Sequence, residues 1–408
     1  MMCGQQYSPE SKDTRQHNSV YLRQMMKRIV LKHGKEVSLL RKHAWIFSGA
    51  VYSVEEGVEE GDMVEVHTSK EEMIATAHFG GGSILGRVVR FGSEEVDQAY
   101  WNSTFTQAWN MRKNAGLGQG TDTDCFRLVN AEGDGMPGLI VDVYGSGCAV
   151  QSHSAGMQKN IPNILAAIEQ LDGLDFKTIY HRPASKGKPE FLKGDEQSSE
   201  VLENGMKFNV NWVEGQKTGF FLDQRDNRKL LGELANGRSV LNTFCYTGGF
   251  SVAALLGGAT KVVSIDVSGP AIELAKTNAT LNKVDDDRHE AIAIDTFEYL
   301  KKAEDFDIII LDPPAFAKHM RKRHNAIQGY RRLNKEALEK LKPGSLLLTF
   351  SCSQVVDSHM FEKAVMSAAL DAGVNAVILK RMGHGIDHPV SLFHPEGDYL
   401  KGLLLEVR

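Results

Sequence analysis

Cys352 is the residue whose type and position most directly suggest covalent chemistry. It follows the apolar run "SLLLTF" and lies between Ser351 and Ser353, where a small apolar residue would pack more simply. A buried free cysteine without any chemistry is common, and this segment alone favours that simpler interpretation. An ionised thiol is also a strong nucleophile, so the neighbouring motifs must decide between the two.

Other polar residues occur where further apolar runs end. The run "SVLNT" leads into "FCYTGG", "KVVSI" ends at Asp266, "HEAIAI" ends at Asp295, and "FDIIIL" leads into "DPP", which begins at Asp312. Taken singly, each acid is explained as a helix N-cap, and "DPP" as a strand terminator. Doubly wound α/β folds bind ligands outside the carboxyl ends of their strands, so the whole set predicts one binding site.

The segment "FCYTGG" predicts the kind of ligand. Gly248 and Gly249 allow a ligand to approach the backbone closely, but the pattern is not GxGxxG and contains no basic residue. Asp266 follows at the spacing where a carboxylate can accept hydrogen bonds from both hydroxyls of a ribose. These features disfavour a dinucleotide and favour a nucleoside with little phosphate, such as S-adenosylmethionine.

The elements that must position these residues alternate between strands and helices from about residue 200 onward. Short runs of valine, isoleucine and leucine without polar alternation are typical of a parallel sheet with helices on both faces. Upstream, residues 27–95 contain short β-like runs, such as "RIVLK", "DMVEVHTS" and "GRVVRFG", which predict a small β-barrel module. Residues 100–195 predict a mixture of helices and strands, and the polar stretch "SKGKPEFLKGDEQSSE" predicts a loop or linker.

Composition and charge narrow the class of protein. The chain has 408 residues and a formal net charge of −5, which by itself does not favour a nucleic-acid binder. Lysine and arginine are nevertheless concentrated at 23–42 and between Asp312 and Glu336, as expected where a polyanion binds. The cysteines are odd in number and scattered without a CxxC spacing, so we expect neither a metal site nor a disulfide framework.

Targeting signals are also missing from the sequence. The N-terminal residues are polar and lack the apolar core of a signal peptide, and no apolar run is long enough to span a bilayer. We therefore expect a cytoplasmic protein without a membrane partner. The sequence leaves a homodimer open.

Together these motifs resemble those of the bacterial large-subunit (23S) ribosomal RNA cytosine-5 methyltransferases that carry an N-terminal PUA domain. The matching stretches include "LLRKHAWIFSGAV", "KTGFFLDQRDNR", "LNTFCYTGGF", "ILDPPAFAK", "GYRRLN", "LLTFSCS" and "HPEGDYLKG", and the resemblance covers nearly all of residues 29–408. It implies an α/β fold whose catalytic domain, at 196–408, is a class I methyltransferase with a Rossmann-like, mostly parallel sheet. It further implies a PUA-like RNA-binding β-barrel at 27–97 and a mixed α/β middle domain at 98–195. We expect residues 1–26 to be a disordered extension.

The resemblance also implies roles for individual residues. Cys352 is the implied nucleophile, and Asp312 is the catalytic group that holds the polar edge of the base. The implied residues around the cofactor, S-adenosylmethionine, are Phe221, Gln224, Phe244, Tyr246, Thr247, Gly248, Gly249, Asp266, Val267, Asp295 and Asp312, with Asp223 and Arg225 nearby. The implied residues around the substrate, large-subunit ribosomal RNA, are Pro313, Pro314, Phe316, Lys318, Arg321, Arg323, Tyr330 and Arg331. Phe316 or Tyr330 would stack on the target base.

The chemistry of cytosine explains why a thiol would be needed. Carbon 5 is a poor nucleophile, but a thiolate that adds to carbon 6 makes the ring enamine-like, so carbon 5 can take up a methyl group. Many RNA cytosine-5 enzymes have a second cysteine after the proline of the fourth-strand motif, where this chain has Ala315. Asp312 or water must then remove the proton from carbon 5. Cys245 is a rival nucleophile, although its place in the cofactor loop favours a packing role.

Two other functions remain open at this point. Methylation of an amino group of guanine or adenine suits "DPP" followed by an aromatic residue, and that reaction needs no cysteine. A non-catalytic RNA-binding factor for ribosome assembly, which senses S-adenosylmethionine, is the second alternative. The acids at each cofactor position argue against it.

Overall fold

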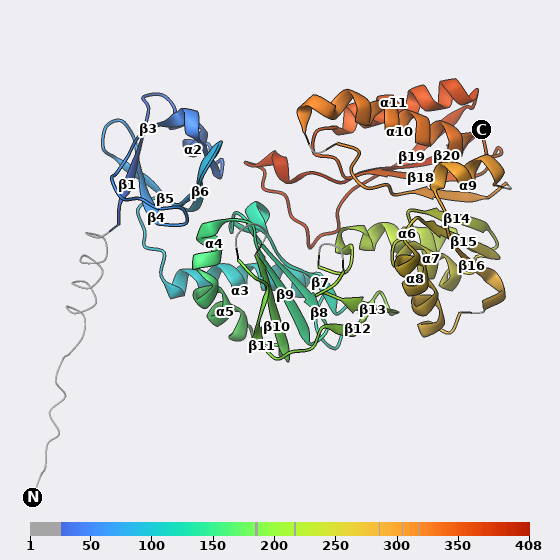
Figure 1. Ribbon diagram of the computed structural model, residues 1–408, viewed down its shortest axis with the longest axis horizontal. Helices are drawn as coiled ribbons and strands as arrows, with labels where there is room; N and C mark the ends of the chain where they lie inside the picture. Colours follow the sequence, from blue (N-terminus) through green and yellow to red (C-terminus); the bar gives the residue numbers. More distant parts are fainter. Residues whose placement is uncertain (1–25, 184–186, 216–217, 285, 304, 318) are drawn as a thin grey trace, which may run out of the picture.

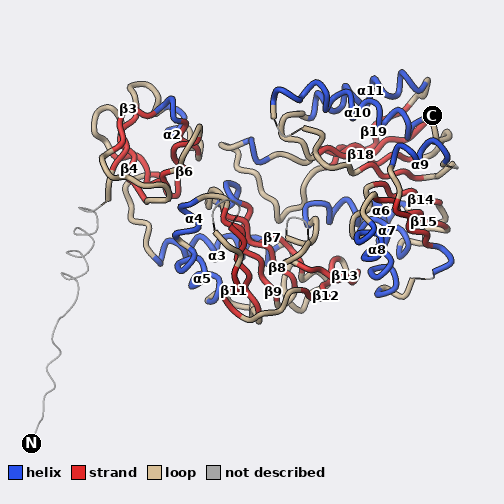
Figure 2. The backbone as a smooth tube through the Cα atoms, viewed as in Figure 1, coloured by secondary structure: helices blue, strands red, loops and turns tan. Residues whose placement is uncertain are grey.

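The computed structural model describes residues 26–183, 187–215, 218–284, 286–303, 305–317 and 319–408. The expectation of disorder for residues 1–26 falls almost wholly outside this part of the chain. Within the described residues, the structure contains four β-sheets that follow one another along the sequence. Figures 1 and 2 show the first sheet apart from the others, joined to them by a short connection and by a long loop near the C-terminus.

The N-terminal sheet is mixed and curls around a small core of its own. Its strand order is β2-β6-β5-β4-β1-β3. The strands are β1 (Arg28–Leu31), β2 (Trp45–Phe47), β3 (Val51–Val54), β4 (Met63–His67), β5 (Met73–Phe79) and β6 (Ile84–Phe91), with the short helix α2 (Val37–Leu40). In β4, Val64 and Val66 are buried while their neighbours are partly exposed, the alternation of a strand with one face on a core. The three β-like runs predicted from the sequence are strands β1, β4 and β6.

The middle sheet has the strand order β11-β10-β9-β8-β7 and carries helices on one face. Its strands are β7 (Cys125–Asn130), β8 (Leu139–Tyr144), β9 (Gly147–Ser152), β10 (Thr178–Pro183) and β11 (Glu190–Lys193). The helices are α3 (Gln98–Asn114), α4 (Ala155–Lys159) and α5 (Ile161–Glu169). Trp101, Phe105 and Ile164 of these helices pack on the sheet in one hydrophobic cluster.

The polar stretch predicted as a loop or linker instead contains strand β11 and the start of the next hairpin. β11 pairs antiparallel with β10, and the ring of Phe191 lies 4.9 Å from that of Tyr180. This part of the prediction is wrong because cross-strand packing outweighs the low strand propensity of the lysines and glycines around it.

A two-stranded hairpin joins the middle sheet to the C-terminal sheet. It consists of β12 (Ser198–Glu203) and β13 (Met206–Asn211), linked by Asn204 and Gly205 with φ of 49° and 75°. Two central residues with positive φ are what a tight hairpin turn requires, and Asn-Gly is the preferred pair. Behind the hairpin, the ring of Trp212 stacks on Tyr144 of the middle sheet, with centroids 6.0 Å apart. The same cluster includes Val252 of the C-terminal region, so the hairpin shares a core with both neighbours.

The C-terminal sheet has the strand order β16-β15-β14-β17-β18-β20-β19. Its strands are β14 (Ser239–Thr243), β15 (Lys261–Asp266), β16 (His289–Ala293), β17 (Ile308–Leu311), β18 (Leu346–Ser351), β19 (Ala376–Met382) and β20 (Lys401–Val407). Its helices are α6 (Arg225–Leu234), α7 (Gly249–Leu256), α8 (Gly269–Leu281), α9 (Thr296–Lys302), α10 (Arg323–Leu338) and α11 (Ser358–Ala372). The strands from β14 to β18 are parallel, and β20 is inserted antiparallel between β18 and β19. The five strands predicted from apolar runs are therefore present, in a mostly parallel sheet.

Both faces of this sheet are covered, which explains the uninterrupted apolar strands. Leu241 and Ile309 face a cluster that contains residues of α9, α10 and α11. Their neighbours Val240 and Ile308 face the opposite cluster, which contains residues of α6, α7 and α8. Successive residues of a strand point to opposite faces, so both sets of positions are mainly apolar when helices cover both faces.

The β19–β20 loop, residues 383–400, connects this sheet to the rest of the molecule. In Figure 1 it extends from the C-terminal sheet toward β6 of the N-terminal sheet. The ring of His394 lies 4.4 Å from that of Trp45 in β2, and Asn130 Nδ2 donates a 3.0 Å hydrogen bond to the Pro389 carbonyl oxygen. The loop therefore contacts both upstream sheets.

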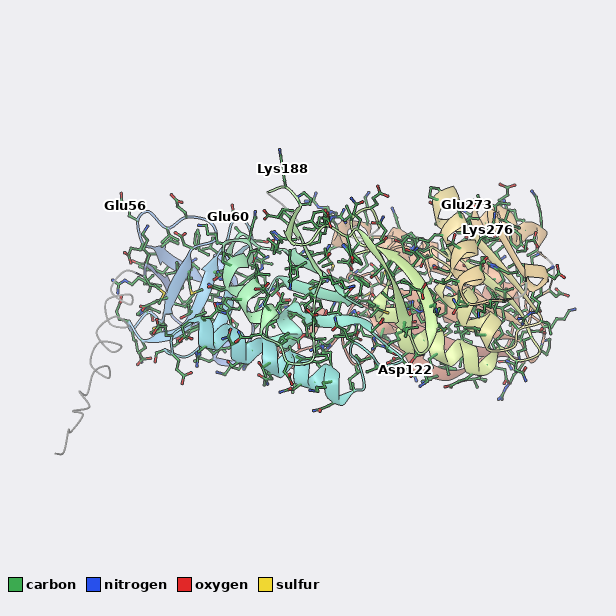
Figure 3. All side chains as sticks on the ribbon, turned by 90° about the horizontal axis from the view of Figure 1, so that it is seen from below. Glu56, Glu60, Asp122, Lys188, Glu273 and Lys276 are labelled. Carbon is green, nitrogen blue, oxygen red and sulfur yellow. The ribbon has the colours of Figure 1, made fainter. Side chains whose placement is uncertain are left out.

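Charged side chains lie over the outside of the molecule, as Figure 3 shows for Glu273 and Lys276 of α8. Lys276 Nζ donates to Glu273 Oε1 at 2.9 Å in an exposed ion pair of the kind that contributes little to stability. In the described residues, no helix is long and apolar enough to cross a membrane.

Candidate functional site

A pocket lies at the carboxyl edge of the C-terminal sheet, where the sequence places its polar residues. Residues 244–247 after β14, Asp266 at the end of β15, Asp312 after β17 and Cys352 after β18 all line it. These segments are far apart in the sequence, but parallel strands bring their carboxyl ends to one edge. The predicted site residues that line the pocket are Phe221, Gln224, Phe244, Tyr246, Thr247, Gly249, Asp266, Val267, Asp312, Pro313, Pro314 and Cys352.

The loop between β14 and α7 has an unusual backbone. Phe244 and Tyr246 have positive φ of 54° and 48°, although bulky side chains seldom adopt this conformation, and Gly248 follows with a φ of 76°. Gly248 lies just behind the pocket wall, where a Cβ atom would come within 2.8 Å of Ala275 Cβ. The loop therefore requires a glycine at this position, and its strained residues lie at the ligand site, where such strain is often found.

Asp266 fixes this loop and also faces the pocket. Its Oδ2 accepts a hydrogen bond from the backbone N–H of Tyr246 at 3.1 Å, and its Oδ1 accepts one from Ser268 at 2.9 Å. A carboxylate offers about four acceptor sites, so each oxygen retains capacity for one ribose hydroxyl. The carboxylate thus fits a nucleoside and positions the loop around it.

Aromatic and amide side chains of residues 220–224 form the opposite wall. The ring of Phe221 meets that of Tyr246 edge to face at 5.2 Å. Gln224 Nε2 donates a 3.0 Å hydrogen bond to Asp312 Oδ2, and Asn227 Nδ2 donates to Gln224 Oε1 at 2.6 Å. The segment after the hairpin is therefore bonded directly to the "DPP" motif.

The charge of the pocket suits a ligand without phosphates. Arg228 lines the pocket, but its guanidinium donates to both oxygens of Glu203, at 2.6 and 2.5 Å, and lies over the ring of Phe220. Arg225, which was expected beside the cofactor, instead donates to both oxygens of the buried Asp387. The arginines on this side are thus neutralised by carboxylates, and a phosphate group would find an acidic surface.

The two cysteines at the pocket differ in their surroundings. Burial and the nearby Asp266 raise the pKa of the Cys245 thiol, so it stays protonated at neutral pH. The Cys352 thiol is less buried and lies 3.9 Å from the Pro313 carbonyl oxygen. Of the two, only Cys352 is partly accessible beside the "DPP" motif.

Some predicted residues lie away from the pocket. Asp295 is exposed and caps α9 by accepting a hydrogen bond from the Glu298 N–H at 3.1 Å. Tyr330 is fully buried, with its ring 4.7 Å from Phe316 and 5.3 Å from Phe361, so it supports Phe316 and cannot itself stack on a base. Arg331 donates two hydrogen bonds to Asp371 of α11 and ties two helices together. The structure therefore does not place Tyr330 or Arg331 in the lining of this pocket.

The remaining predicted substrate residues lie at the start of α10. Phe316 is partly buried in the loop after "DPP", and Arg321 and Arg323 are exposed and partly exposed. Lys318 lies outside the described residues. In the described part of the chain, neither Arg321 nor Arg323 forms an ion pair, so both guanidinium groups are available to an anion.

Several residues that line the pocket were not predicted from the sequence: Phe220, Arg228, Phe250, Ser268 and Leu400. Phe220 and Arg228 are the first and last residues of the stretch "FFLDQRDNR", so that stretch was the available signal. Leu400 is the last residue of the β19–β20 loop, and only the antiparallel insertion of the following strand, β20, brings it beside β18. No local pattern in the sequence indicates such an insertion.

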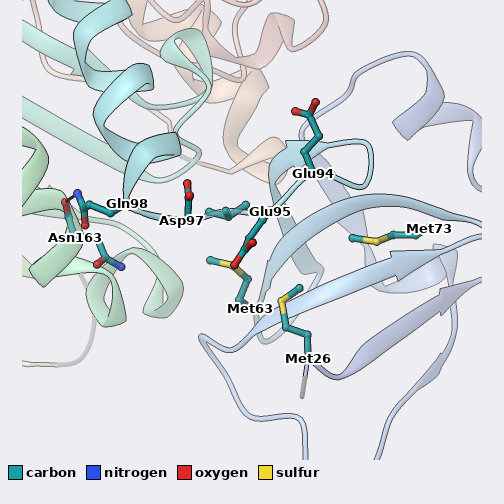
Figure 4. Close-up of a pocket in the computed structure, with 9 residues that line it drawn as sticks. Met26, Met63, Met73, Glu94, Glu95, Asp97, Gln98 and Asn163 are labelled. Atoms are coloured by element: carbon teal, nitrogen blue, oxygen red, sulfur yellow. Dashed lines mark hydrogen bonds between the residues drawn. The ribbon is translucent and has the colours of Figure 1, made fainter. Parts of the chain in front are cut away.

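Two further clusters were considered as sites. A cavity between β4, β5 and the start of α3, shown in Figure 4, is lined by Met26, Met63 and Met73 together with Glu94, Glu95 and Asp97. Its acidic wall does not suit a polyanion. His43, His394 and Glu396 could in principle hold a metal ion, since their ligand atoms lie within 4.8 Å of one another. A 3.3 Å hydrogen bond between His43 Nε2 and Glu396 Oε1 already explains why two of these three residues lie close together.

Comparisons with sequence families agree with this architecture. Residues 166–372 match the family described as S-adenosylmethionine-dependent methyltransferase, and residues 29–91 match the PUA-like domain. A protein of Tolumonas auensis named "Ribosomal RNA large subunit methyltransferase I" is 40% identical over 394 residues, which is 92% of this chain and 98% of that protein. An Aeromonas hydrophila protein with the same name is 40% identical over 93% of this chain and 99% of its own length.

Solved structures show the same fold over nearly the whole chain. A candidate S-adenosylmethionine-dependent methyltransferase from Streptococcus mutans has a TM-score of 0.81 and 25% identity, covering 93% of this chain and all of its own. Another candidate methyltransferase structure, which contains SAH, has a TM-score of 0.82 and 25% identity over the same share of both chains. The predicted class I methyltransferase fold with a PUA-like barrel is therefore confirmed, and S-adenosylmethionine is the cofactor.

Proposed function

This chain belongs to the S-adenosylmethionine-dependent methyltransferases that also carry a PUA-like domain, and we propose that it methylates carbon 5 of a cytosine in large-subunit ribosomal RNA. The names of its relatives supply the class of substrate. The observation that carries the choice of atom is that Cys352 lines the same pocket as Asp312 and Asp266. A thiol in that place serves carbon-5 chemistry and has no task in amino-group methylation.

In the proposed reaction, Cys352 divides one difficult step into easier ones. Its thiolate adds to carbon 6, a sulfur–carbon bond forms, and electron density moves toward carbon 5. Bound S-adenosylmethionine supplies the methyl group. A base then removes the proton from carbon 5, the ring double bond re-forms, and the Cys352 thiolate leaves. Ala315 offers no group for the proton, so Asp312 or a water molecule beside it takes that role in our proposal.

Residues around "DPP" would hold the target base. Asp312 is partly buried and is oriented by Gln224, which suits a carboxylate that binds the polar edge of cytosine. Phe316 rests on Tyr330 and is the aromatic ring available for stacking. A base inside a duplex cannot reach such a pocket, so the nucleotide must be single-stranded or extruded.

The basic residues and the PUA-like domain would hold the surrounding RNA. Arg321 and Arg323 lie close in sequence to the "DPP" motif and carry no ion pair within the described residues, so they suit contacts to phosphates. We propose a division into a PUA-like domain at 27–97, a middle domain at 98–195 and a methyltransferase domain at 196–408, in a cytoplasmic enzyme. The hairpin 198–211 packs against both the middle domain and the rest of the methyltransferase domain, so the two domains share a core at this boundary.

The deciding experiment is transfer of labelled methyl groups to ribosomal RNA, followed by nucleoside analysis. We expect 5-methylcytidine as the product. Cys352→Ala should lower the rate by several powers of ten, because no other described group in the pocket is suited to activate carbon 5, and it should leave cofactor binding intact. Cys245→Ala is the matched control and should be much milder.

Trapping identifies the nucleophile directly. RNA that contains 5-fluorocytosine at the target should form a stable adduct, because fluorine cannot leave as a proton does, and mass spectrometry should place it on Cys352. An active Cys352→Ala enzyme, an adduct on Cys245, or a methylated amino group as product would replace this proposal with the amino-group reaction.

A further inference from the structure

A buried lysine contacts the residue that follows the proposed nucleophile. Lys401 is the first residue of β20, and the antiparallel register pairs it with Ser351, the last residue of β18. Its side chain is only 6% exposed, and its Nζ donates a 2.7 Å hydrogen bond to the Ser353 carbonyl oxygen. Lys401 is therefore held by the residues on both sides of Cys352.

The ammonium group of Lys401 differs from the other cations near the pocket. Arg228 and Arg225 are each bound by both oxygens of a carboxylate. Among the residues that the structure describes, Lys401 forms no such ion pair, and its partner is a neutral carbonyl group. A buried ammonium without an anion is costly, so an anion that forms nearby during the reaction would be stabilised.

The charged groups around Lys401 and Cys352 come from several elements. Burial lowers the pKa of Lys401, while Asp398, Cys352 and Asp357 act in the opposite direction. Asp312 lines the same pocket as Cys352. The pKa of Tyr330 is raised to about 12 by burial, and Cys352 and Asp312 act in the same direction. Coupling between two titrating groups is reciprocal, so a thiolate that favours the protonated lysine is itself favoured by that lysine.

We propose that Lys401 is a positioning residue that stabilises the thiolate form of Cys352 and so prepares it to add to the target base. The proton of the thiol passes to solvent, the lysine keeps its own proton, and no electrons are gained or lost. The purpose of this thiolate rests on the proposed function, but its formation can be measured without any RNA.

The test is the pH dependence of Cys352 alkylation in the full-length protein. Iodoacetamide reacts with the thiolate, and peptide mass spectrometry separates Cys352 from the other cysteines. For the wild-type protein we expect half-maximal reactivity below the value of about 8.5 for a free cysteine. Lys401→Met should raise this midpoint by about one pH unit, which is roughly a tenfold loss of thiolate at neutral pH. Lys401→Arg keeps the charge and should restore most of the reactivity.

Lys380→Met is the matched control, because it removes an exposed lysine from the neighbouring strand β19. It should leave the Cys352 profile unchanged. Binding of S-adenosylmethionine reports whether each variant is folded. If Lys401→Met does not fold, the pH profiles of the wild-type and Lys401→Arg proteins test the proposal instead. A wild-type midpoint at or above that of the denatured chain, or a folded Lys401→Met protein with the wild-type profile, overturns the proposal. Failure of the proposed function is recognised separately, since an active Cys352→Ala enzyme rejects the function and leaves the alkylation result as it is.

Discussion

At the scale of single residues, identical side chains acquire different properties from their neighbours. Cys245 and Cys352 both line the pocket, but burial and Asp266 keep the first protonated, while the second is less buried and precedes Ser353, whose carbonyl oxygen accepts a hydrogen bond from Lys401. Residue type alone could suggest a nucleophile and could not say which of the two was suited to the role. The same holds for Tyr330, which packing turns from a stacking surface into a support for Phe316.

Asp266 provides a prediction at this scale. Asp266→Ala should weaken binding of S-adenosylmethionine by about 1–3 kcal/mol, because acceptors for the ribose hydroxyls are lost and the Tyr246 and Ser268 N–H groups lose their partner. Isothermal calorimetry measures this change. Asp97→Ala is the control: it removes the N-cap of α3 and should lower the stability by about 0.5–2 kcal/mol without any effect on cofactor affinity. Equal affinities for wild type and Asp266→Ala would refute the assignment.

At the scale of elements, the loop between β14 and α7 shows how strained backbone is maintained. Its residues with positive φ, Phe244, Tyr246 and Gly248, alternate with residues of ordinary conformation. The Cys245 N–H donates to the Ile265 carbonyl oxygen at 3.0 Å, and the Gly248 N–H donates to the Cys245 carbonyl oxygen at 2.8 Å. These bonds and those of Asp266 hold the loop in its binding conformation before any ligand arrives.

Gly248 and Gly373 have similar backbone conformations, so substituting each in turn distinguishes the effect of backbone strain from that of a steric clash. Gly248→Ala and Gly373→Ala both place a side chain at positive φ, at 76° and 67°, and each should lower the unfolding free energy by about 1–2 kcal/mol. A Cβ at Gly373 meets nothing within 4 Å, whereas one at Gly248 comes within 2.8 Å of Ala275 Cβ. Only Gly248→Ala should therefore weaken cofactor binding, as measured by calorimetry. A similar loss in Gly373→Ala would show that global destabilisation is the cause.

The sequence was sufficient for the elements whose signals are local. The parallel strands and the polar residues at the strand ends follow from apolar runs and from what ends them. The strand at Glu190–Lys193, the insertion of β20 and the ion pair of Arg331 with Asp371 depend on partners far along the chain. These features are determined by packing between distant residues, which cannot be inferred from a single sequence.

At the scale of the whole molecule, one buried carboxylate joins segments from two sheets. Asp387 in the β19–β20 loop accepts two hydrogen bonds from Arg225, at 2.9 and 2.8 Å, and one from the Arg127 N–H at 2.9 Å. Arg112 donates to the Asp387 carbonyl oxygen at 2.7 Å and to both oxygens of Asp134. Burial opposes the ionisation of Asp387, but His388 and Arg225 outweigh it and hold its pKa well below the usual range.

Removing this carboxylate should destabilise the protein strongly. Asp387→Ala leaves Arg225 buried without its partner, and we expect a loss of about 3–5 kcal/mol in denaturant unfolding near neutral pH. Because the folded pKa of Asp387 is depressed, its contribution is fully present above about pH 4 and is lost as the pH falls below that value. The difference between wild type and Asp387→Ala should therefore be constant from pH 7 to 5 and shrink only in acid. Asp371→Ala, which breaks the exposed pair with Arg331, should have a far smaller effect, and equal losses in the two variants would contradict the role of Asp387.

The β19–β20 loop also bears on how this protein is made. Arg112 and Asp387 are 275 positions apart, and a ribosome adds about 5–20 residues per second, so roughly 14–55 s pass between their syntheses. The N-terminal and middle sheets can fold in that interval, but His394, Pro389 and Asp387, which fasten them to the C-terminal sheet, emerge afterwards. Lys401 follows only a few residues later. The final arrangement of the sheets and the activation of the thiol therefore arise together, at the end of translation, and a nascent chain that stalls before this loop carries a folded front half without a working active site.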